Sequence, residues 1–288
     1  MQPRELIFEG RGGLRLRADA WGDPEAPAVL LLHGGGQTRH AWGGTAAALA
    51  RDGRFAIALD QRGHGDSEWH GDGDYRLAAF AADLVRVLGR LPPSPALVGA
   101  SLGGLAILLA AETPGFAPSA VVLVDVAPRL EPEGTRRITE FMTDRRDGFA
   151  TLEEAADHIA SYTRERTRGR NLKGLLKVLR RGEDGRYRWH WDPLFITDRG
   201  PNEIVDRERL LDCARRIAAP ALVVRGRQSD VLSPEGAAEL VASFPDAKLV
   251  DVSGAGHMVA GDRNEVFTQA VVGFLRRCGQ ATPGARAG

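Results

Sequence analysis

The residues best suited to chemistry surround a serine at position 101. The stretch Gly99-Ala100-Ser101-Leu102-Gly103 has the pattern G-x-S-x-G, follows a short apolar run and opens an apolar segment of helical length. In such a strand-to-helix turn the serine is strained, and the flanking glycines avoid clashes that a Cβ would make with the adjacent strand and helix. The helix that follows directs its N-terminal N–H groups at the serine. The pattern therefore predicts Ser101 as a nucleophile.

A serine hydroxyl needs a base that removes its proton during attack. Among the seven histidines, His257 has the most suitable position, in the glycine-rich stretch 254–257 after the last predicted strand and before the last predicted helix. The carboxyl ends of parallel strands share one edge of a sheet, so a loop at that edge can reach Ser101. We predict that His257 is the base.

A third residue must orient the imidazole and stabilise its charged form. Asp230 follows the apolar run Ala221–Arg225, which gives the chain order serine, aspartate, histidine. Asp125 is a rival, because it also ends a buried run near the same edge. We predict Asp230 as the acid and keep Asp125 as the alternative. Asp60, at the start of the stretch 60–67, is expected to brace a loop by hydrogen bonds.

Acyl transfer creates an oxyanion that preorganised N–H groups must stabilise. One donor is expected to be the amide of Leu102, directly after the nucleophile. The other should come from the loop His33-Gly34-Gly35-Gly36, which follows the apolar run Ala28–Leu32. We predict the amide of Gly35 as the second donor, with Gly34 and Gly36 beside the substrate.

The elements that position these residues alternate between short buried strands and helices. This alternation predicts an α/β fold with a mostly parallel, doubly wound sheet. Between 129 and 212 the alternation stops and helical patterns follow one another, so we interpret this part as a helical cap inserted between 1–128 and 213–288 of one core. The expected strands and helices are a hairpin of Glu5–Glu9 and Leu14–Ala20, strands Ala28–Leu32, Phe55–Leu59, Ala96–Val98, Ala120–Val124, Ala221–Arg225 and Lys248–Val252, and helices Thr45–Arg51, Asp74–Leu91, Thr135–Asp147, Leu152–Arg164, Leu172–Leu179, Pro234–Phe244 and Asn264–Arg277.

The composition excludes several functional classes. The 38 basic and 38 acidic residues of the 288 balance, so no net charge attracts nucleic acid or an anionic membrane. Two distant cysteines, Cys213 and Cys278, give neither a disulfide framework nor a metal site. No signal peptide or membrane span is visible, which predicts a cytoplasmic protein. We expect no cofactor, no metal and a small-molecule substrate, with a homo-oligomer possible.

Aromatic residues of the cap suggest an apolar substrate. Trp189 and Trp191 lie in the cap, and Trp42 follows the His33 loop, so we predict all three as substrate contacts; packing of the cap on the core is the alternative. The stretch Arg164–Arg188 carries ten basic and three acidic residues, a pattern typical of a solvated face and an alternative site for an anion.

The order of these motifs resembles the α/β-hydrolase superfamily, in particular its capped bacterial branch of esterases, lactonases, carbon–carbon bond hydrolases and cofactor-free haloperoxidases. His33-Gly34, the 60–67 loop, Ser101, Asp230 and His257 stand in that family's order over nearly the whole chain. Relatives that open epoxides or remove halide carry an aspartate in place of the serine, so the resemblance argues against these reactions here. The three glycines after His33 replace a bulky residue of many members, which leaves the size of the acyl pocket open.

These observations lead to three hypotheses. The first is hydrolysis of a carboxylic ester or lactone of a small apolar substrate through an acyl-enzyme. The second uses the same triad to cleave a carbon–carbon bond beside a ketone or to make a peracid. The third is a ligand-binding member without turnover, which the complete set of Ser101, His257 and an aspartate disfavours.

Overall fold

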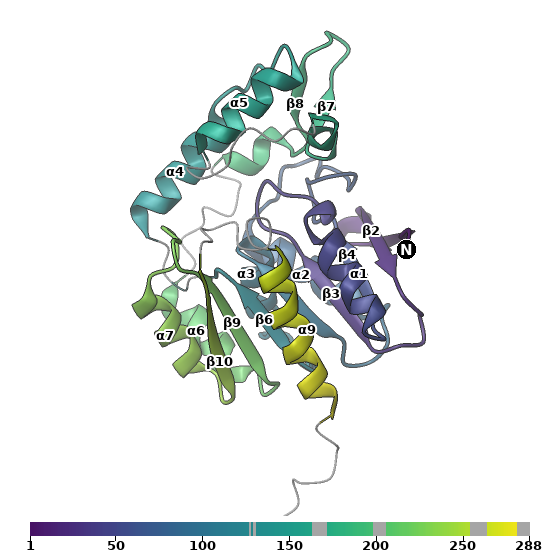
Figure 1. Cartoon of the computed structure of the whole chain (residues 1–288), viewed down its shortest axis with the longest axis vertical. Helices are drawn as coiled ribbons and strands as arrows, with labels where there is room; N and C mark the ends of the chain where they lie inside the picture. Colours follow the sequence, from purple (N-terminus) through teal and green to yellow (C-terminus); the bar gives the residue numbers. More distant parts are fainter. Residues whose placement is uncertain (127, 129–130, 163–171, 198–205, 254–263, 281–288) are drawn as a thin grey trace, which may run out of the picture.

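The fold is built on one eight-stranded sheet (Figure 1). The computed structural model describes residues 1–126, 128, 131–162, 172–197, 206–253 and 264–280. β2 is antiparallel to its neighbours β1 and β4, and all other neighbours are parallel. This confirms the predicted α/β fold with a mostly parallel sheet. In spatial order the strands are β1 (Arg4–Glu9), β2 (Arg15–Trp21), β4 (Phe55–Leu59), β3 (Ala28–Leu32), β5 (Ala96–Ala100), β6 (Val121–Val124), β9 (Ala221–Gly226) and β10 (Ala247–Val252).

Helices cover both faces of the sheet because its central strands are apolar on both sides. In β3, Leu30 and Leu32 pack into one core cluster, and the alternate residues Val29 and Leu31 pack into the other. The first cluster includes residues of α2 (Leu77–Leu88), α3 (Leu102–Ala110), α6 (Arg207–Arg216) and α7 (Pro234–Ser243), and the second includes residues of α1 (Gly43–Arg51) and α9 (Asn264–Gln280).

The strand register brings several chain segments to one edge of the sheet. Ala100 of β5 pairs with Val124 of β6, and Val124 pairs with Val224 of β9. In turn, Gly226 of β9 pairs with Val252 of β10. The residues that follow these four strands therefore leave the sheet at neighbouring places, as the sequence predicts for the candidate catalytic groups.

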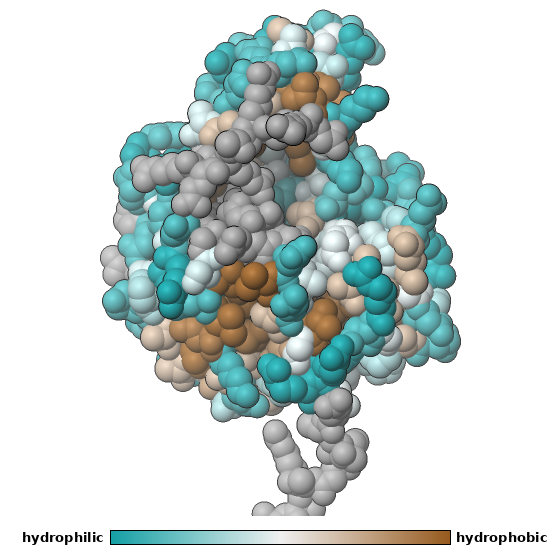
Figure 2. All heavy atoms as spheres, viewed as in Figure 1, coloured by the Kyte–Doolittle hydropathy of each residue, from teal (hydrophilic) through white to brown (hydrophobic). Residues whose placement is uncertain are grey.

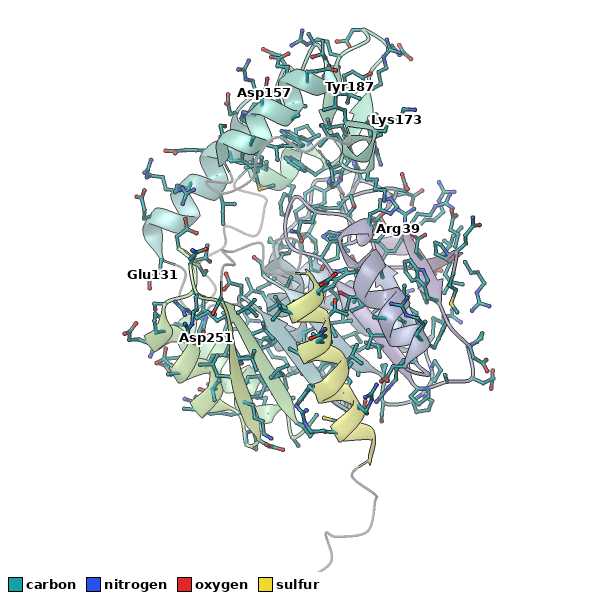
Figure 3. The ribbon with its side chains drawn as sticks, in the orientation of Figure 1. Arg39, Glu131, Asp157, Lys173, Tyr187 and Asp251 are labelled. Atoms are coloured by element: carbon teal, nitrogen blue, oxygen red, sulfur yellow. The ribbon has the colours of Figure 1, made fainter. Side chains whose placement is uncertain are left out.

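The insertion forms a cap above this edge (Figure 1; Figure 3, where Asp157, Lys173 and Tyr187 lie in the cap and Arg39 in the core beneath it). The prediction of a purely helical cap missed an antiparallel pair of short strands, β7 and β8. The expected boundary at 212 falls inside α6, which packs against α3 and α7 of the core. The cap elements are α4 (Pro132–Thr143), α5 (Leu152–Tyr162), the 3-10 helix η3 (Leu172–Lys177), β7 (Leu179–Arg181), β8 (Tyr187–Trp189) and the 3-10 helix η4 (Pro193–Ile196).

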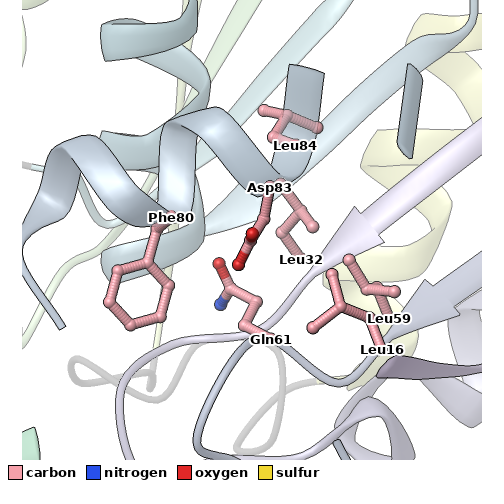
Figure 4. A pocket seen from close by; sticks show the side chains of 7 residues that line it. All are labelled: Leu16, Leu32, Leu59, Gln61, Phe80, Asp83 and Leu84. Atoms are coloured by element: carbon pink, nitrogen blue, oxygen red, sulfur yellow. The ribbon is translucent and has the colours of Figure 1, made fainter. Parts of the chain in front are cut away.

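Two hollows of the core lie away from the predicted site. One holds about 10 Å³, roughly a single water, and Gln61 and Asp83 project into it from its wall (Figure 4). The other, of about 490 Å³, opens where β3, β5 and β6 begin, opposite the edge that carries Ser101, and there Arg276 pairs with Asp52. Neither has the position expected of an active site in a parallel sheet.

The face seen in Figure 2 has a polar cap and an apolar area lower on the core. On the face seen in Figure 2 the cap is mainly hydrophilic, and apolar surface gathers around β9, β10 and α9. Leu249 of β10 and Val266 of α9 are large exposed apolar residues in this region. Among the described helices, none has both the length and the apolar character needed to span a bilayer.

Candidate active site

Ser101 occupies the strained turn that the sequence predicts. Its φ of 44° and ψ of −113° lie outside the regions that non-glycine residues favour. A Cβ on Gly99 would lie 2.6 Å from the Gly103 carbonyl, and a Cβ on Gly103 would lie 2.5 Å from the Leu32 carbonyl oxygen. Both glycines are therefore required for the close packing of β5, α3 and β3 around the serine.

The loop after β3 lies directly beside Ser101. A Cβ on Gly34 would be 3.5 Å from the Cβ of Ser101, and a Cβ on Gly35 would be 4.0 Å from Leu102 Cδ2. The structure thus brings together the serine and the two residues whose amides are predicted to bind an oxyanion. Leu102 is the first residue of α3, where backbone N–H groups lack intrahelical acceptors.

The amides of the glycine loop differ in their partners. The Gly34 N–H donates to Gln37 Oε1 at 3.0 Å, and the Gly36 N–H donates to His64 Nε2 at 3.1 Å. Within the described part of the chain, the Gly35 N–H has no such acceptor. The hydrogen bonds of the Gly34 and Gly36 amides fix the loop, and the Gly35 N–H, which has no acceptor among the described residues, is suited to donate to an oxyanion.

Buried imidazoles support the glycine loop. His33 Nδ1 lies 2.8 Å from the Gly34 carbonyl oxygen, and its Nε2 accepts from the Gln61 N–H at 3.0 Å. Burial lowers the pKa of His33 to about 4 and that of His64 to about 3. Both rings are therefore neutral near pH 7 and can accept these backbone N–H groups.

The two candidate acids have different surroundings. Asp125 is buried directly after β6, with a φ of 49°, and its Oδ2 accepts from the Ser229 hydroxyl at 2.6 Å. Ser101 donates its N–H to the carbonyl of Val124, the last residue of β6, at 2.9 Å. Asp125 follows Val124 directly, so it lies at the end of the strand next to the nucleophile. The side chain of Asp230 is 36% exposed and forms an ion pair with Arg137 of α4.

Three other residues of the sequence analysis have different outcomes. His257 lies outside the described residues, in the connection between β10 and α9. Asp60 braces its loop as expected, since its carboxylate accepts from the backbone N–H of Arg39 at 2.6 Å and of Asp66 at 2.9 Å. The prediction for Trp42 needs correction: it has no exposed surface and packs on Phe267, so it belongs to the core and cannot contact a substrate.

The cap covers the glycine loop with apolar side chains. A Cβ on Gly36 would lie 3.0 Å from Met142 and 3.3 Å from Trp191, and one on Gly35 would lie 3.3 Å from Phe195. The glycines thus leave room for side chains of the cap. Trp189 stacks on Trp191 at 4.7 Å between ring centroids, so it supports this cover from behind.

Three polar residues make contacts at the site that the sequence did not predict. Ser229 holds Asp125, His64 holds Gly36, and His190 of the cap contacts both the glycine loop and the 60–67 loop. His64 lies in the 60–67 stretch and Ser229 directly precedes Asp230, but only the fold shows what they contact. The described residues contain no group of His, Cys, Asp and Glu side chains that could hold a metal ion.

Comparison with known proteins agrees with the fold. The family model of the alpha/beta hydrolase fold matches residues 27–263. The chain is 32% identical over 265 residues to Esterase Rv0045c of Mycobacterium tuberculosis, spanning 88% of this chain and 84% of that protein. It is 33% identical over 258 residues to the 3-hydroxybutyrate-oligomer hydrolase of Cupriavidus necator, spanning 84% and 87%. A solved alpha/beta hydrolase from Novosphingobium aromaticivorans superposes with a TM-score of 0.81 at 29% identity, covering 96% of this chain and 99% of that chain.

The chain belongs to the α/β hydrolase fold family. These relationships also confirm the predicted enzyme class, an α/β hydrolase acting on ester bonds.

Proposed function

We propose that this chain hydrolyses a carboxylic ester or lactone of a small, apolar substrate through an acyl-enzyme on Ser101. His257 takes the hydroxyl proton while Ser101 Oγ attacks the carbonyl carbon. The amides of Gly35 and Leu102 stabilise the resulting oxyanion. The carbon–oxygen bond then breaks, and the leaving alkoxide takes the proton from His257. A water attacks the acyl-enzyme in the same manner and releases the acid and Ser101.

The observation that carries this proposal is the arrangement of Ser101 and its loop. The strained serine stands at the amino end of α3, beside a loop in which the amides of Gly34 and Gly36 have acceptors while that of Gly35 has none among the described residues. A binding protein has no need for such a combination, whereas acyl transfer requires it. The apolar cover of Met142, Trp191 and Phe195 above the loop favours an apolar acyl group.

For the acid, we favour Asp125 over the Asp230 of the sequence prediction. A triad carboxylate must be held rigidly and keep its charge available to the imidazolium. The burial of Asp125 and its bond from Ser229 meet this need, whereas Arg137 already neutralises Asp230 at a half-exposed place. The location of His257 after β10 is compatible with either carboxylate.

The test is a panel of activated esters and lactones of increasing acyl length, assayed with the wild type and Ser101→Ala. We expect turnover of short and medium acyl chains and its loss, by a factor of about 10⁴ or more, in the variant. Turnover that survives in Ser101→Ala would refute the proposal. Turnover of β-diketones or peracid formation, without any ester hydrolysis, would move the assignment to the second hypothesis. The predicted cytoplasmic location stays a prediction.

A further inference from the structure

His190 links the cap to the oxyanion loop. It lies between β8 and η4, is 2% exposed, and contacts two loops of the core. Its Nδ1 accepts from the Gly65 N–H at 2.7 Å, and its Nε2 lies 3.2 Å from the Gly36 carbonyl oxygen. Because Nδ1 accepts, Nε2 must carry the proton and donate to Gly36 in the neutral ring. The pKa of His190 lies well below its ordinary value because of burial, which agrees with a neutral ring.

The bond to Gly36 continues through two peptide groups. The Gly36 carbonyl belongs to the same peptide as the Gln37 N–H, which donates to the Gly34 carbonyl at 3.1 Å. The Gly34 carbonyl in turn belongs to the same peptide as the Gly35 N–H. Peptides are planar with N–H and C=O opposed, so fixing the Gly34 carbonyl also fixes the direction of the Gly35 N–H.

The chain of bonds has one direction. It runs from His190 Nε2–H to the Gly36 carbonyl, from the Gln37 N–H to the Gly34 carbonyl, and ends at the Gly35 N–H. Each bond polarises the next peptide and makes its N–H a stronger donor. His64 restrains the intervening peptide by accepting the Gly36 N–H.

We infer that His190 is a positioning residue through which the cap orients and polarises the oxyanion amide of Gly35. This inference rests on the proposed function, since it gives a catalytic purpose to that amide. It makes the cap part of the catalytic apparatus in addition to a cover of the substrate.

Two substitutions of His190 separate its hydrogen bond with Gly36 from its hydrogen bond with Gly65. The amide of His190→Gln reaches the position of Nε2 and can still donate to Gly36. The shorter amide of His190→Asn replaces Nδ1 and keeps only the bond to Gly65. The inference expects kcat to fall by about 10- to 100-fold in the Asn variant with little change in KM, and to stay within a few-fold in the Gln variant.

A merely structural role of His190 in holding the 60–67 loop predicts the reverse order, since only the Asn variant keeps that bond. The inference is overturned if His190→Asn equals the wild type or if His190→Gln loses as much as His190→Asn. Thermal melting of both variants shows whether either has simply lost its fold.

Two further readouts keep this test separate from the proposed function. The rate of phosphonylation by a fluorophosphonate, which also places an oxygen at the oxyanion position, should follow the same order of variants. No labelling of the wild type would refute the proposed function itself. Hydrogen exchange of a peptide covering 33–38 needs no activity: faster exchange in His190→Asn than in His190→Gln supports the restraint, and equal exchange overturns it.

Discussion

The strained backbone of Ser101 depends on the glycines on either side of it. A non-glycine residue at a φ of 44° costs about 1–2 kcal/mol, which packing around the turn must offset. Gly99 and Gly103 allow that packing, since their hydrogens face backbone atoms of α3 and β3. The two glycines thus let the strained serine sit between β5 and α3, next to the glycine loop.

The first prediction concerns Gly103. Gly103→Ala would place a Cβ 2.5 Å from the Leu32 carbonyl oxygen, so strand and helix must separate. We expect a loss of about 1–3 kcal/mol in unfolding free energy, measured with urea, and a loss of ester turnover. Gly43→Ala is the control, because a Cβ there meets nothing within 4 Å in helix α1. Equal stability of the two variants would show that the elbow is not tightly packed.

The second prediction separates the two acids. If Asp125 orients His257, Asp125→Asn lowers kcat by about 10⁴ and leaves KM nearly unchanged. Asp230→Asn should cost less than about tenfold, since it removes a half-exposed ion pair with Arg137. Ser229→Ala should reduce kcat moderately by releasing Asp125. A greater loss in Asp230→Asn than in Asp125→Asn would restore the assignment made from the sequence.

The choice of acid illustrates the limit of sequence reasoning at this scale. Asp125 and Asp230 both follow buried strands at the same edge, and the sequence prediction of Asp230 was made without knowledge of the surroundings of either carboxylate. What distinguishes them is burial and the partner of each carboxylate, and these depend on Ser229 and on the distant Arg137 of the cap. Trp42 was misplaced for a similar reason, because nearness in sequence to the His33 loop did not reveal its packing on Phe267.

Among the elements, the cap supplies the side chains that the glycine loop lacks. Three glycines present no side chain toward the acyl group, and Met142, Trp191 and Phe195 occupy the space beside them. If the acyl group binds beside this loop, as the proposed function requires, side chains from another part of the chain set the size of its pocket. Substrate selectivity could then change through the cap without altering the backbone of the glycine loop.

The third prediction concerns Met142 of the cap, which lies beside the glycine loop. Met142→Ala should open space next to Gly36 and shift the preferred acyl chain of the substrate toward greater length, by about 10-fold in relative kcat/KM. Met142→Leu, which nearly conserves volume, is the matched control and should keep the wild-type profile. The measurement is kcat/KM across a series of p-nitrophenyl esters. An unchanged chain-length profile in Met142→Ala would place the acyl group elsewhere.

The elements themselves were predictable where their pattern was strong. Runs such as Ala28–Leu32 and Phe55–Leu59 are buried on both faces, so continuous apolar residues marked them, and the structure has the same bounds. β7 and β8 of the cap were missed because they are three residues long and rich in arginine. Short half-exposed strands depend on pairing with each other, which local periodicity does not reveal.

At the scale of the whole molecule, the neutral buried histidines couple stability to pH. The pKa values of His33, about 4, and His64, about 3, lie below the ordinary 6.5. The unfolded chain therefore binds protons below pH 6.5 that the native protein does not take up until about pH 4. Stability is full above pH 6.5 and falls as the pH drops toward 4.

The fourth prediction is this loss of stability on mild acidification. Between pH 7.5 and pH 5, each of the two histidines should contribute a decrease of about 2 kcal/mol at most in the unfolding free energy. Urea unfolding at a series of pH values at constant ionic strength measures it. A flat or rising stability over this interval would mean that His33 and His64 are protonated in the native protein.

The proposed function requires that Ser101 is the residue that becomes acylated. Reaction of the wild type with a fluorophosphonate, followed by peptide mapping with mass spectrometry, tests it most directly. We expect one adduct per chain, located on Ser101, and no adduct in Ser101→Ala under the same conditions. An adduct on another residue, or labelling that persists in Ser101→Ala, would contradict it.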